Sequence, residues 1–229
     1  MVSVAFPAYN EAENIGKAVK EFKSQKHVDE VVVADNNSTD GTGSIARKAG
    51  ATVFIEKRQG YGSACQRALK ETRGYYIILV EPDGTFSGSD CERLLEQADN
   101  YDFVLGTRTD KKFIRKGANM NPFLRFGNIF IAKLTQLLYG GPELTDVGCT
   151  MRLIKRDALR KIQDKFKVTG SSFSPEMIVV ALKNDISIVE IPVSYRKRVG
   201  TSKITGEFKK AFKLGLVMIK LIITYRFKD

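Results

Sequence analysis

Two acidic residues with a single residue between them come directly after the most apolar short run of the sequence. Tyr-Ile-Ile-Leu-Val at 76–80 is followed at once by Glu81-Pro82-Asp83-Gly84. Hard divalent cations such as Mg²⁺ and Mn²⁺ prefer carboxylate oxygens, and one or two are enough when substrate phosphates complete the shell. A metal ion at Glu81 and Asp83 would neutralise a departing diphosphate. The alternative is a structural turn, because Pro, Asp and Gly are common turn residues.

A second polar cluster, at 35–42, follows another apolar run and reads Asp-Asn-Asn-Ser-Thr-Asp-Gly-Thr. Its carboxylates and amides could recognise a base and a ribose, or they could cap the helix that follows. The usual phosphate-binding motifs are absent from the sequence. Gly60-Tyr61-Gly62 would need a glycine at Cys65 to complete GxGxxG, and no GxxxxGK[ST] occurs. Nucleotide binding would therefore need another design.

The rare residues exclude several kinds of site. His27 is the single histidine, so a His-rich zinc site and a HExxH protease are excluded. A Ser-His-Asp triad would depend on this residue, which lies in a charged stretch typical of a surface turn. Cys65, Cys91 and Cys149 are far apart and form no CxxC, which favours a reducing compartment over a disulfide framework. No signal peptide precedes the first apolar run, so we expect a cytoplasmic location.

Composition indicates a globular protein with anionic partners. The 229 residues are 43% hydrophobic and 28% charged, which argues against disorder. Lys and Arg number 37 against 26 Asp and Glu, giving a formal net charge of +11. Such a charge favours nucleotides, nucleic acid or an acidic membrane surface as partners.

The elements that must position these residues alternate between strand-like and helix-like patterns. Apolar runs predict strands at 2–6, 31–33, 52–55, 76–80 and 103–105. Helical spacing predicts helices at 11–22, from the end of the second polar cluster to about 49, at 63–72 and at 90–98. This alternation is typical of an α/β fold with a mostly parallel sheet. Both polar clusters follow strands at their carboxyl ends, where open α/β sheets bind ligands.

The pattern changes after Lys111, where two long apolar segments carry cations. One runs from Pro122 to about Tyr139, and the other, 208–227, contains four lysines and Arg226. Neither has the uncharged length of about 18–20 residues that a spanning helix needs. Lysines among Phe, Leu and Ile suit amphipathic helices at a membrane interface. The alternative is that these helices simply cover the sheet.

In their order along the chain, the motifs resemble those of inverting family 2 glycosyltransferases, and within that family the polyprenyl-phosphate enzymes that include dolichyl-phosphate mannose synthases. The matching segments, which span nearly the whole chain, lie at 6–11, 35–42, 58–62, 81–83, 106–108, 145–152, 190–193 and 200–203. The resemblance implies a GT-A (Rossmann-like) fold, with a mixed, mostly parallel sheet flanked by helices and late amphipathic helices. It also implies one domain over 1–229, with a nucleotide-binding half at 1–110 and an acceptor- and membrane-facing half at 111–229.

The resemblance implies roles for individual residues. The nucleotide pocket would be lined by Pro7, Ala8, Tyr9 and Glu11, with Asp35 and Asn36 at the base and Asp40 supporting their loop. Glu81, Pro82 and Asp83 occupy the Asp-x-Asp position of the family. Glu81 would lie near the ribose or the metal, and Asp83 would be the metal ligand. Positions that handle the phosphates of donor or acceptor are matched by Arg108, Arg125 and Lys203. The arginine before the last motif could be Arg196 or Arg198, of which we favour Arg198.

The implied reaction is a single displacement at the anomeric carbon, assisted by Mg²⁺ or Mn²⁺. The donor would be a nucleoside-diphosphate sugar, with GDP-mannose favoured over UDP-glucose by resemblance alone. A polyprenyl or dolichyl phosphate acceptor is already anionic and needs no strong base. A sugar hydroxyl on a lipid-linked glycan would need one, and Asp146 is then the candidate, unless it only caps the turn after Thr145. We expect action at the cytoplasmic face of a membrane, without nucleic acid.

Two other classes of protein stay open on the sequence alone. A nucleotidyltransferase would use similar metal and nucleotide loops, but it leaves the segments at 145–150 and 200–203 unexplained. A basic lipid- or nucleic-acid-binding module without catalysis would use the positive charge. It would not need acids at strand ends, which repel phosphates unless a metal intervenes.

Overall fold

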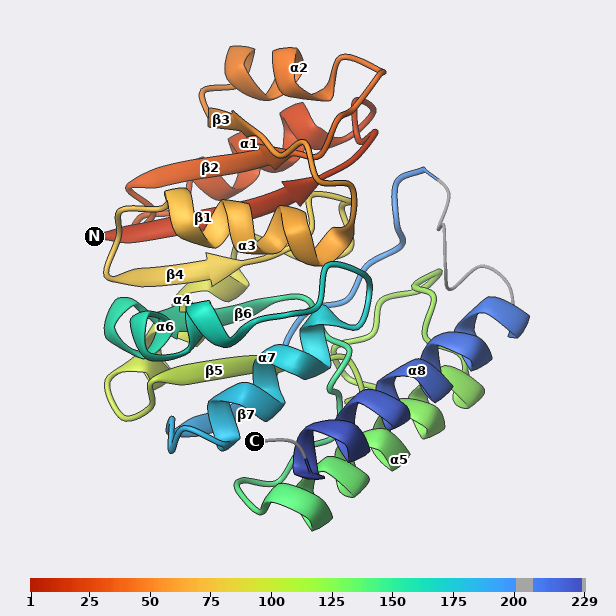
Figure 1. Ribbon diagram of the computed structural model, residues 1–229. Coiled ribbons are helices and arrows are strands. Elements are labelled where there is room, and N and C mark those ends of the chain that lie inside the picture. Colours follow the sequence, from red (N-terminus) through yellow and green to blue (C-terminus); the bar gives the residue numbers. More distant parts are fainter. Residues whose placement is uncertain (201–207, 228–229) are drawn as a thin grey trace.

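One mixed β-sheet runs through the computed structural model, which describes residues 1–200 and 208–227 (Figure 1). Within these residues the sheet has seven strands in the order β3-β2-β1-β4-β6-β5-β7. Their bounds are β1 Val2–Ala8, β2 Glu30–Asp35, β3 Thr52–Ile55, β4 Tyr76–Leu79, β5 Phe103–Thr107, β6 Arg152–Lys155 and β7 Ile188–Pro192. β6 is antiparallel to both of its neighbours, while the other pairings are parallel.

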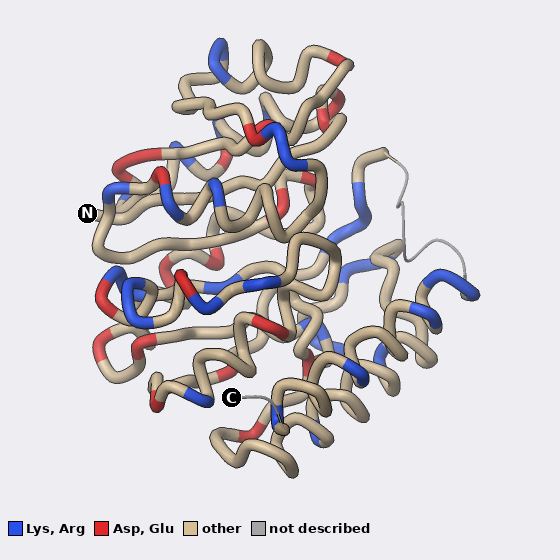
Figure 2. The backbone as a smooth tube through the Cα atoms, viewed as in Figure 1, with Lys and Arg blue, Asp and Glu red and all other residues tan. Residues whose placement is uncertain are grey.

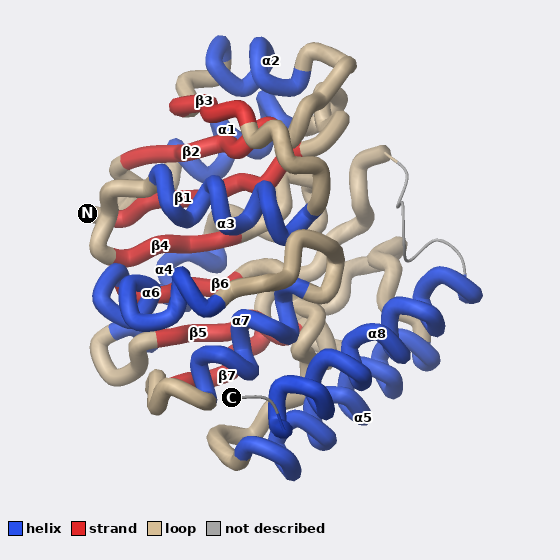
Figure 3. The backbone as a smooth tube through the Cα atoms, in the orientation of Figure 1, coloured by secondary structure: helices blue, strands red, loops and turns tan. Residues whose placement is uncertain are grey.

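Helices cover both faces of the sheet (Figure 3). One face packs against α1 (Ile15–Lys23), α2 (Thr42–Lys48) and α4 (Asp90–Ala98). The other packs against α3 (Tyr61–Glu71), α6 (Arg156–Ile162) and α7 (Phe173–Leu182), and a short 3₁₀ turn, η1 (Gln163–Lys165), follows α6. Along β1, Val4 and Phe6 face one apolar layer and Ala5 faces the other, all without solvent exposure. Burial on both faces explains why these strands read as continuous apolar runs.

The strand order places a ligand-binding crevice beside β1. β2 lies on one side of β1 and β4 on the other, so the chain connections run in opposite directions from this point. In an open α/β sheet such a reversal leaves a crevice at the carboxyl ends of the strands. The segments after β1 and β4, which begin at Tyr9 and Val80, therefore meet at this edge.

The predicted elements of the first half are present, with several shifted boundaries, since the strand expected at 2–6 continues to Ala8 and the helix expected at 63–72 spans Tyr61–Glu71. The helix expected from Glu11 begins at Ile15. Asn10 has a positive φ of 53°. The amide of Glu11 donates to Thr42 Oγ1 at 2.8 Å, which draws these residues into a loop against α2. Side-chain contacts far apart in sequence have overridden the helical pattern here.

Several elements of the second half were not predicted from the sequence. They are β6, α6, α7 and β7. β6 begins with Arg152, a charged residue that is nevertheless only 1% exposed. Its guanidinium donates to the carbonyl oxygens of Ser174, at 2.9 Å, and Cys149. A buried strand that starts with a charged side chain has no apolar pattern to reveal it.

Two long helices lie side by side at one edge of the molecule (Figure 1). They are α5 (Pro122–Tyr139) and α8 (Phe208–Phe227), as the late apolar segments predicted. Their inner sides pack together, and Tyr139 Oη donates to the carbonyl oxygen of Ile222 at 2.7 Å. Among the described residues, none of the helices is long and apolar enough to cross a membrane.

Candidate active site

A pocket of about 480 Å³ opens at the carboxyl ends of β1 and β4. One end is lined by residues from the loops after β1, β2 and β3, the middle by the acidic loop after β4, and the far end by α7 and α8. The residues that line it include Pro7, Tyr9, Glu11, Asn36, Gln59, Gly60, Tyr61, Glu81, Pro82, Asp83, Arg108, Thr150, Ser174, Arg198, Leu214 and Met218. The ends of β1, β2, β3 and β4 thus share one cavity with two later helices.

Asn36 holds the first end of the pocket together. Its amide nitrogen donates to the carbonyl oxygens of Glu56 and Arg58, each at 2.9 Å. Its amide oxygen accepts from the backbone of Gly60 at 2.8 Å. Because every polar atom of this side chain binds the loop after β3, Asn36 shapes the wall of the pocket from within.

The two aspartates of the polar cluster after β2 turn away from the cavity. Asp35 is buried, and its carboxylate accepts from the amide of Ser38 at 3.0 Å. Asp40 accepts from the amide of Ala12 at 3.0 Å and from Thr42 Oγ1 at 2.5 Å. Burial opposes ionisation of Asp40, but these hydrogen bonds bring its pKa below the ordinary value. Its contacts tie the loops after β1 and β2 together, as expected of a supporting residue.

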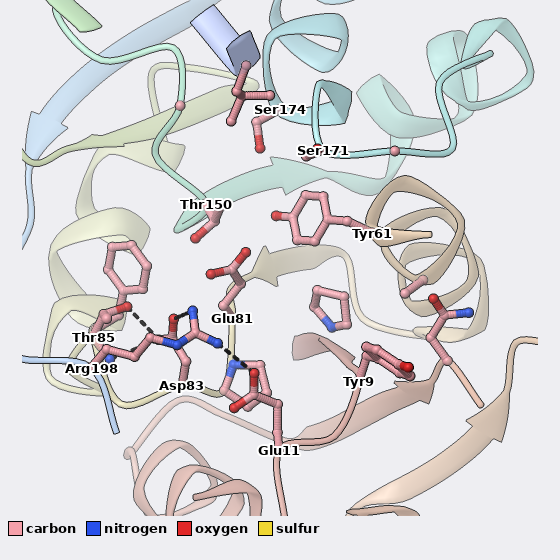
Figure 4. Close-up of a pocket in the computed structure, with 18 of the residues that line it drawn as sticks. Tyr9, Glu11, Tyr61, Glu81, Asp83, Thr85, Thr150, Ser171, Ser174 and Arg198 are labelled. Atoms are coloured by element: carbon pink, nitrogen blue, oxygen red, sulfur yellow. Dashed lines mark hydrogen bonds and ion pairs between the residues drawn. The ribbon is translucent and has the colours of Figure 1, made fainter. Parts of the chain in front are cut away.

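An arginine from the segment after β7, Arg198, binds the acidic loop that follows β4 (Figure 4). Asp83 Oδ2 accepts from Arg198 at 2.7 Å, and Oδ1 accepts from the amide and hydroxyl of Thr85 at 2.9 and 2.5 Å. Arg198 also binds Glu11 at 2.7 Å, so it joins the loops after β1 and β4. Burial lowers the pKa of Arg198, while Asp83 and Glu11 more than compensate and raise it overall.

Of the two candidate arginines, only one lines the cavity. Arg198 does so, whereas Arg196 pairs with Glu21 at 3.2 Å and contacts Ser87 outside the lining. The backbone of the same segment is paired with the acidic loop, because the amide of Val199 donates to the carbonyl oxygen of Asp83 at 2.9 Å. The segment thus positions Arg198 with both backbone and side chain.

Glu81 is the second carboxylate of the loop and points into the same cavity (Figure 4). Its pKa is raised to about 8, first by burial and then by the negative charge of Asp83. Arg198 and Arg108 lower it, but by less. A cation added beside these two carboxylates would offset the negative charge of Asp83 that raises the pKa of Glu81.

The carboxylate oxygens of Glu81 and Asp83 suit a hard divalent cation. Within residues 1–200 and 208–227, no group of three or more His, Cys, Asp and Glu side chains is arranged to hold a metal ion. The pair Glu81 and Asp83 supplies oxygen donors only, and two carboxylates are the usual protein share when diphosphate oxygens complete the coordination. The observation that makes the fit is that both carboxylates line one cavity, where the charge of Asp83 raises the pKa of Glu81. Mg²⁺ and Mn²⁺ both match such ligands.

A second arginine is held beside the acidic loop by a buried carboxylate. Arg108 Nε donates to Asp146 Oδ2 at 2.8 Å, and one of its terminal nitrogens donates to Oδ1 at 2.9 Å. The Asp146 side chain has no exposed surface, and the Arg108 side chain is 14% exposed where it lines the pocket. Burial lowers the pKa of Arg108, but the charge and the hydrogen bonds of Asp146 outweigh burial. The pKa is raised overall, so the guanidinium stays charged.

Further polar groups fix Asp146 in turn. The amides of Asp146 and Thr145 donate to the Glu190 carboxylate at 3.0 and 2.9 Å. The hydroxyl of Thr145 contacts those of Thr107 and Thr109 at 2.8 and 2.7 Å. This network lies behind the cavity wall and leaves Asp146 bound on both of its oxygens.

The structure gathers most, but not all, of the predicted site residues at the cavity. Those that line it are Pro7, Tyr9, Glu11, Asn36, Glu81, Pro82, Asp83, Arg108 and Arg198. Those outside its lining are Ala8, Asp35, Arg125 and Asp146. Arg125 lies on α5, where its Nε donates to the carbonyl oxygen of Thr109 at 2.7 Å. Lys203 lies outside the described residues.

The far end of the cavity contains residues to which sequence reasoning assigned no role. Tyr61 and Thr150 lie within motifs that the sequence shows, so their neighbourhood could have drawn attention to them. Ser174, Leu214 and Met218 carry no such signal, because they belong to α7 and α8, which only the tertiary fold brings to the strand ends.

Comparison with known proteins identifies a matching family model. The model described as glycosyl transferase family 2 matches residues 3–163 of this chain. The matched region contains every strand of the sheet except β7, together with the acidic loop.

Two curated relatives match nearly the whole chain. An uncharacterized protein of Methanocaldococcus jannaschii is 32% identical over 225 residues, which cover 93% of this chain and 90% of that protein. A protein of Haloferax volcanii named dolichyl-phosphate hexose transferase is 29% identical over 229 residues, with 99% and 96% covered.

Solved structures share the fold. Glucosyl-3-phosphoglycerate synthase from Mycobacterium tuberculosis, crystallised with Mn²⁺, uridine diphosphate and phosphoglyceric acid, superposes with a TM-score of 0.75. The match covers 100% of this chain and 79% of that chain, at 18% identity. The likeness confirms the predicted architecture, a mixed and mostly parallel sheet flanked by helices.

Proposed function

Because this chain belongs to glycosyl transferase family 2, we propose that it moves a hexose from a nucleoside-diphosphate sugar to a polyprenyl phosphate. The main support is that a carboxylate pair and two charged arginines line one cavity. This cavity lies at the point where the strand order reverses. The carboxylates suit a divalent cation, and the arginines suit phosphate oxygens. A donor diphosphate and an anionic acceptor both need such positive charge.

The relatives support both the sugar class and the acceptor. The Haloferax volcanii protein that aligns along 99% of this chain is named for hexose transfer and dolichyl phosphate. The superposed Mycobacterium tuberculosis structure contains Mn²⁺ and uridine diphosphate, and its acceptor also bears a phosphate. GDP-mannose and UDP-glucose are therefore the two donors to test first, and Mg²⁺ and Mn²⁺ the two metals.

In this proposal the first half of the chain binds the nucleotide and the second half binds the acceptor. Residues 1–110 bind the nucleotide along Pro7, Tyr9 and Asn36, and residues 111–229 bring the acceptor beneath α8. Arg108 and Arg198 bind phosphate oxygens and offset the repulsion between donor and acceptor. Glu81 and Asp83 would hold the metal, which when bound supplies a positive charge for the departing diphosphate.

The transfer itself exchanges one bond for another at the anomeric carbon. A phosphate oxygen of the acceptor forms the new bond while the bond to the diphosphate oxygen breaks, and the configuration inverts. The acceptor oxygen is already anionic, so no side chain has to remove a proton. Asp146 is then a positioning residue that orients Arg108, in keeping with its complete burial and its position behind the cavity wall.

Transfer of radiolabelled sugar tests the proposal directly. We expect the purified protein, with Mn²⁺ or Mg²⁺, to convert dolichyl phosphate to a labelled lipid from GDP-mannose or from UDP-glucose. Dolichol, which lacks the phosphate, is the matched control acceptor and should give no product. Equal labelling of dolichol or of a sugar hydroxyl would refute the lipid-phosphate acceptor, and no transfer from any nucleotide sugar would refute the glycosyltransferase proposal.

The α5–α8 pair suits an anionic membrane surface (Figure 2). Large apolar side chains are exposed along both helices, among them Phe126 at 72%, Leu137 at 82% and Leu216 at 52%. Exposed lysines at 209, 210, 213 and 220 accompany them on α8. Apolar groups that enter the interface beside cations that meet lipid phosphates are the mark of a helix lying on a membrane. The cavity opens beside this pair, since Leu214 and Met218 of α8 line it.

Lys213→Glu combined with Lys220→Glu is expected to reduce binding to anionic vesicles by more than tenfold. Each cation near such a surface contributes about 1 kcal/mol, and the reversal replaces attraction with repulsion. Flotation with vesicles that contain phosphatidylserine, at low and high salt, measures the effect. Lys17→Glu with Lys20→Glu on α1 changes the net charge equally and should bind like wild type. Equal loss in both double variants would show that net charge alone matters.

A further inference from the structure

The far end of the cavity has polar atoms with no protein partner. The hydroxyls of Tyr61 and Thr150 are buried, and neither makes a hydrogen bond of good geometry to any of the described residues, although the Tyr61 hydroxyl lies beside the Cys65 thiol. Both residues line the cavity. A buried hydroxyl without a partner costs free energy, so such groups normally have a ligand to bind.

These hydroxyls converge on one place. In Figure 4 the Tyr61 ring points from the start of α3 across the cavity toward Thr150, and the Glu81 carboxylate lies between them. Ser174 of α7 lies on the same side. Burial raises the pKa of Tyr61, Cys65 and Glu81 raise it further, and Arg152 lowers it.

The fold holds Tyr61 rigidly in this position. It stands between Gly60 and Gly62, and a Cβ at either glycine would collide with the backbone carbonyl oxygens of Thr169 or Val168. The amide of Ser63 donates to the carbonyl oxygen of Thr169 at 3.2 Å. This close packing of α3 against the segment before α7 sets the direction of the tyrosine.

The chemistry of this end favours an uncharged ligand rich in hydroxyls. Tyr and Thr hydroxyls both donate and accept hydrogen bonds, as sugar hydroxyls do, whereas a phosphate only accepts. Burial raises the pKa of Tyr61, so its hydroxyl keeps the proton that it donates. The two terminal nitrogens of Arg152 bind the carbonyl oxygens of Ser174 and Cys149, so only its Nε is left without a partner among the described residues.

We propose that Tyr61 and Thr150 form a hydroxyl-binding subsite that selects the hexose of the donor. The inference rests on the proposed function, since it places the sugar ring beyond the diphosphate, on the side of Glu81 away from Arg198. Tyr61 and Thr150 hydrogen-bond the ring hydroxyls, and Glu81 accepts from a further one. The subsite therefore distinguishes hexoses that differ in the orientation of one hydroxyl.

Calorimetric titration in Mn²⁺ tests the subsite by comparing each nucleotide sugar with its free diphosphate. The probes are GDP, UDP, GDP-mannose, UDP-glucose and UDP-galactose. We expect Tyr61→Phe and Thr150→Val each to weaken binding of the preferred nucleotide sugar roughly tenfold, the effect of one lost hydrogen bond from a buried group. Affinity for the free diphosphate should stay unchanged, and the preference between epimeric sugars should narrow.

Matched controls remove the same groups elsewhere. Tyr75 and Thr52 are exposed and lie away from the cavity. The variants Tyr75→Phe and Thr52→Val should therefore bind the nucleotide sugars like wild type. Equal losses for nucleotide sugar and free diphosphate in Tyr61→Phe would show a structural role and overturn the subsite, as would no loss at all. Wild type that binds diphosphates and nucleotide sugars equally well would also overturn it. Wild type that binds none of these probes would refute the proposed function itself.

Discussion

Asp83→Ala is expected to abolish the dependence of nucleotide binding on metal and to reduce sugar transfer by about 10²–10³-fold. Asp83 is the buried member of the carboxylate pair, and its loss leaves Glu81 as the sole carboxylate of the acidic loop. A single carboxylate gives weaker hold on a divalent cation and less compensation for the charge on the departing diphosphate. Titration of the preferred nucleotide in Mn²⁺ and in EDTA measures the first effect directly.

The fold should survive this substitution. Arg198 keeps its contact with Glu11 at 2.7 Å, and the backbone bonds from the amides of Arg196 and Val199 to the carbonyl oxygens at 85 and 83 remain, so the loops after β1 and β4 stay connected. Asp164→Ala, at an exposed position in η1, is the matched control and should retain full metal dependence. If Asp83→Ala binds nucleotide more tightly in Mn²⁺ than in EDTA, as wild type should, then the metal lies elsewhere.

Asp146→Ala is expected to lower the free energy of unfolding by about 3–5 kcal/mol, because it leaves a buried arginine without its counter-charge. Both Asp146 oxygens accept from the Arg108 guanidinium, and the carboxylate has no exposed surface. Urea unfolding measures the loss. Asp157→Ala, which breaks an ion pair whose side chains are 63% and 68% exposed, should cost under about 1 kcal/mol.

A double variant separates stability from activity in this pair. Arg108→Met together with Asp146→Ala removes both buried charges, and we expect most of the lost stability to return. Sugar transfer should not return, because the cavity still lacks the cation that Asp146 positions. Recovery of transfer together with stability would contradict a role for Arg108 in binding phosphate.

The sequence predicted the strands of the first half, where runs of apolar residues coincide with strands that are buried in the sheet. β1, β2, β4 and β5 are apolar because both faces of the sheet are covered there, and the acids at 81 and 83 come just after β4, so their position near the end of β1 could be inferred. The family motifs pointed to Arg108 and to one of two arginines near 197, and the structure shows which of the two lines the cavity.

The rest depends on contacts between distant segments. No local pattern shows that Asn36 is occupied by the loop after β3, or that Asp146 lies behind Arg108. Tyr61 and Thr150 face each other only because α3 and the turn before β6 pack on the same side of the sheet. Such pairings depend on tertiary packing, to which a single sequence gives no direct access.

The position of β6 determines when the site can form during synthesis of the chain. Within residues 1–200 and 208–227, the sheet neighbours of β5 are β6 and β7 alone, and both come later in the chain. A nascent chain can therefore pair β1 to β4 on the ribosome, but β5 stays without a partner until residues 152–155 have emerged. The acidic loop waits longer still, because its backbone pairs with residues 196–199. The Asp83 carboxylate meets Arg198 only when about nine-tenths of the protein has been made, so a chain that ends before residue 196 cannot complete this part of the cavity.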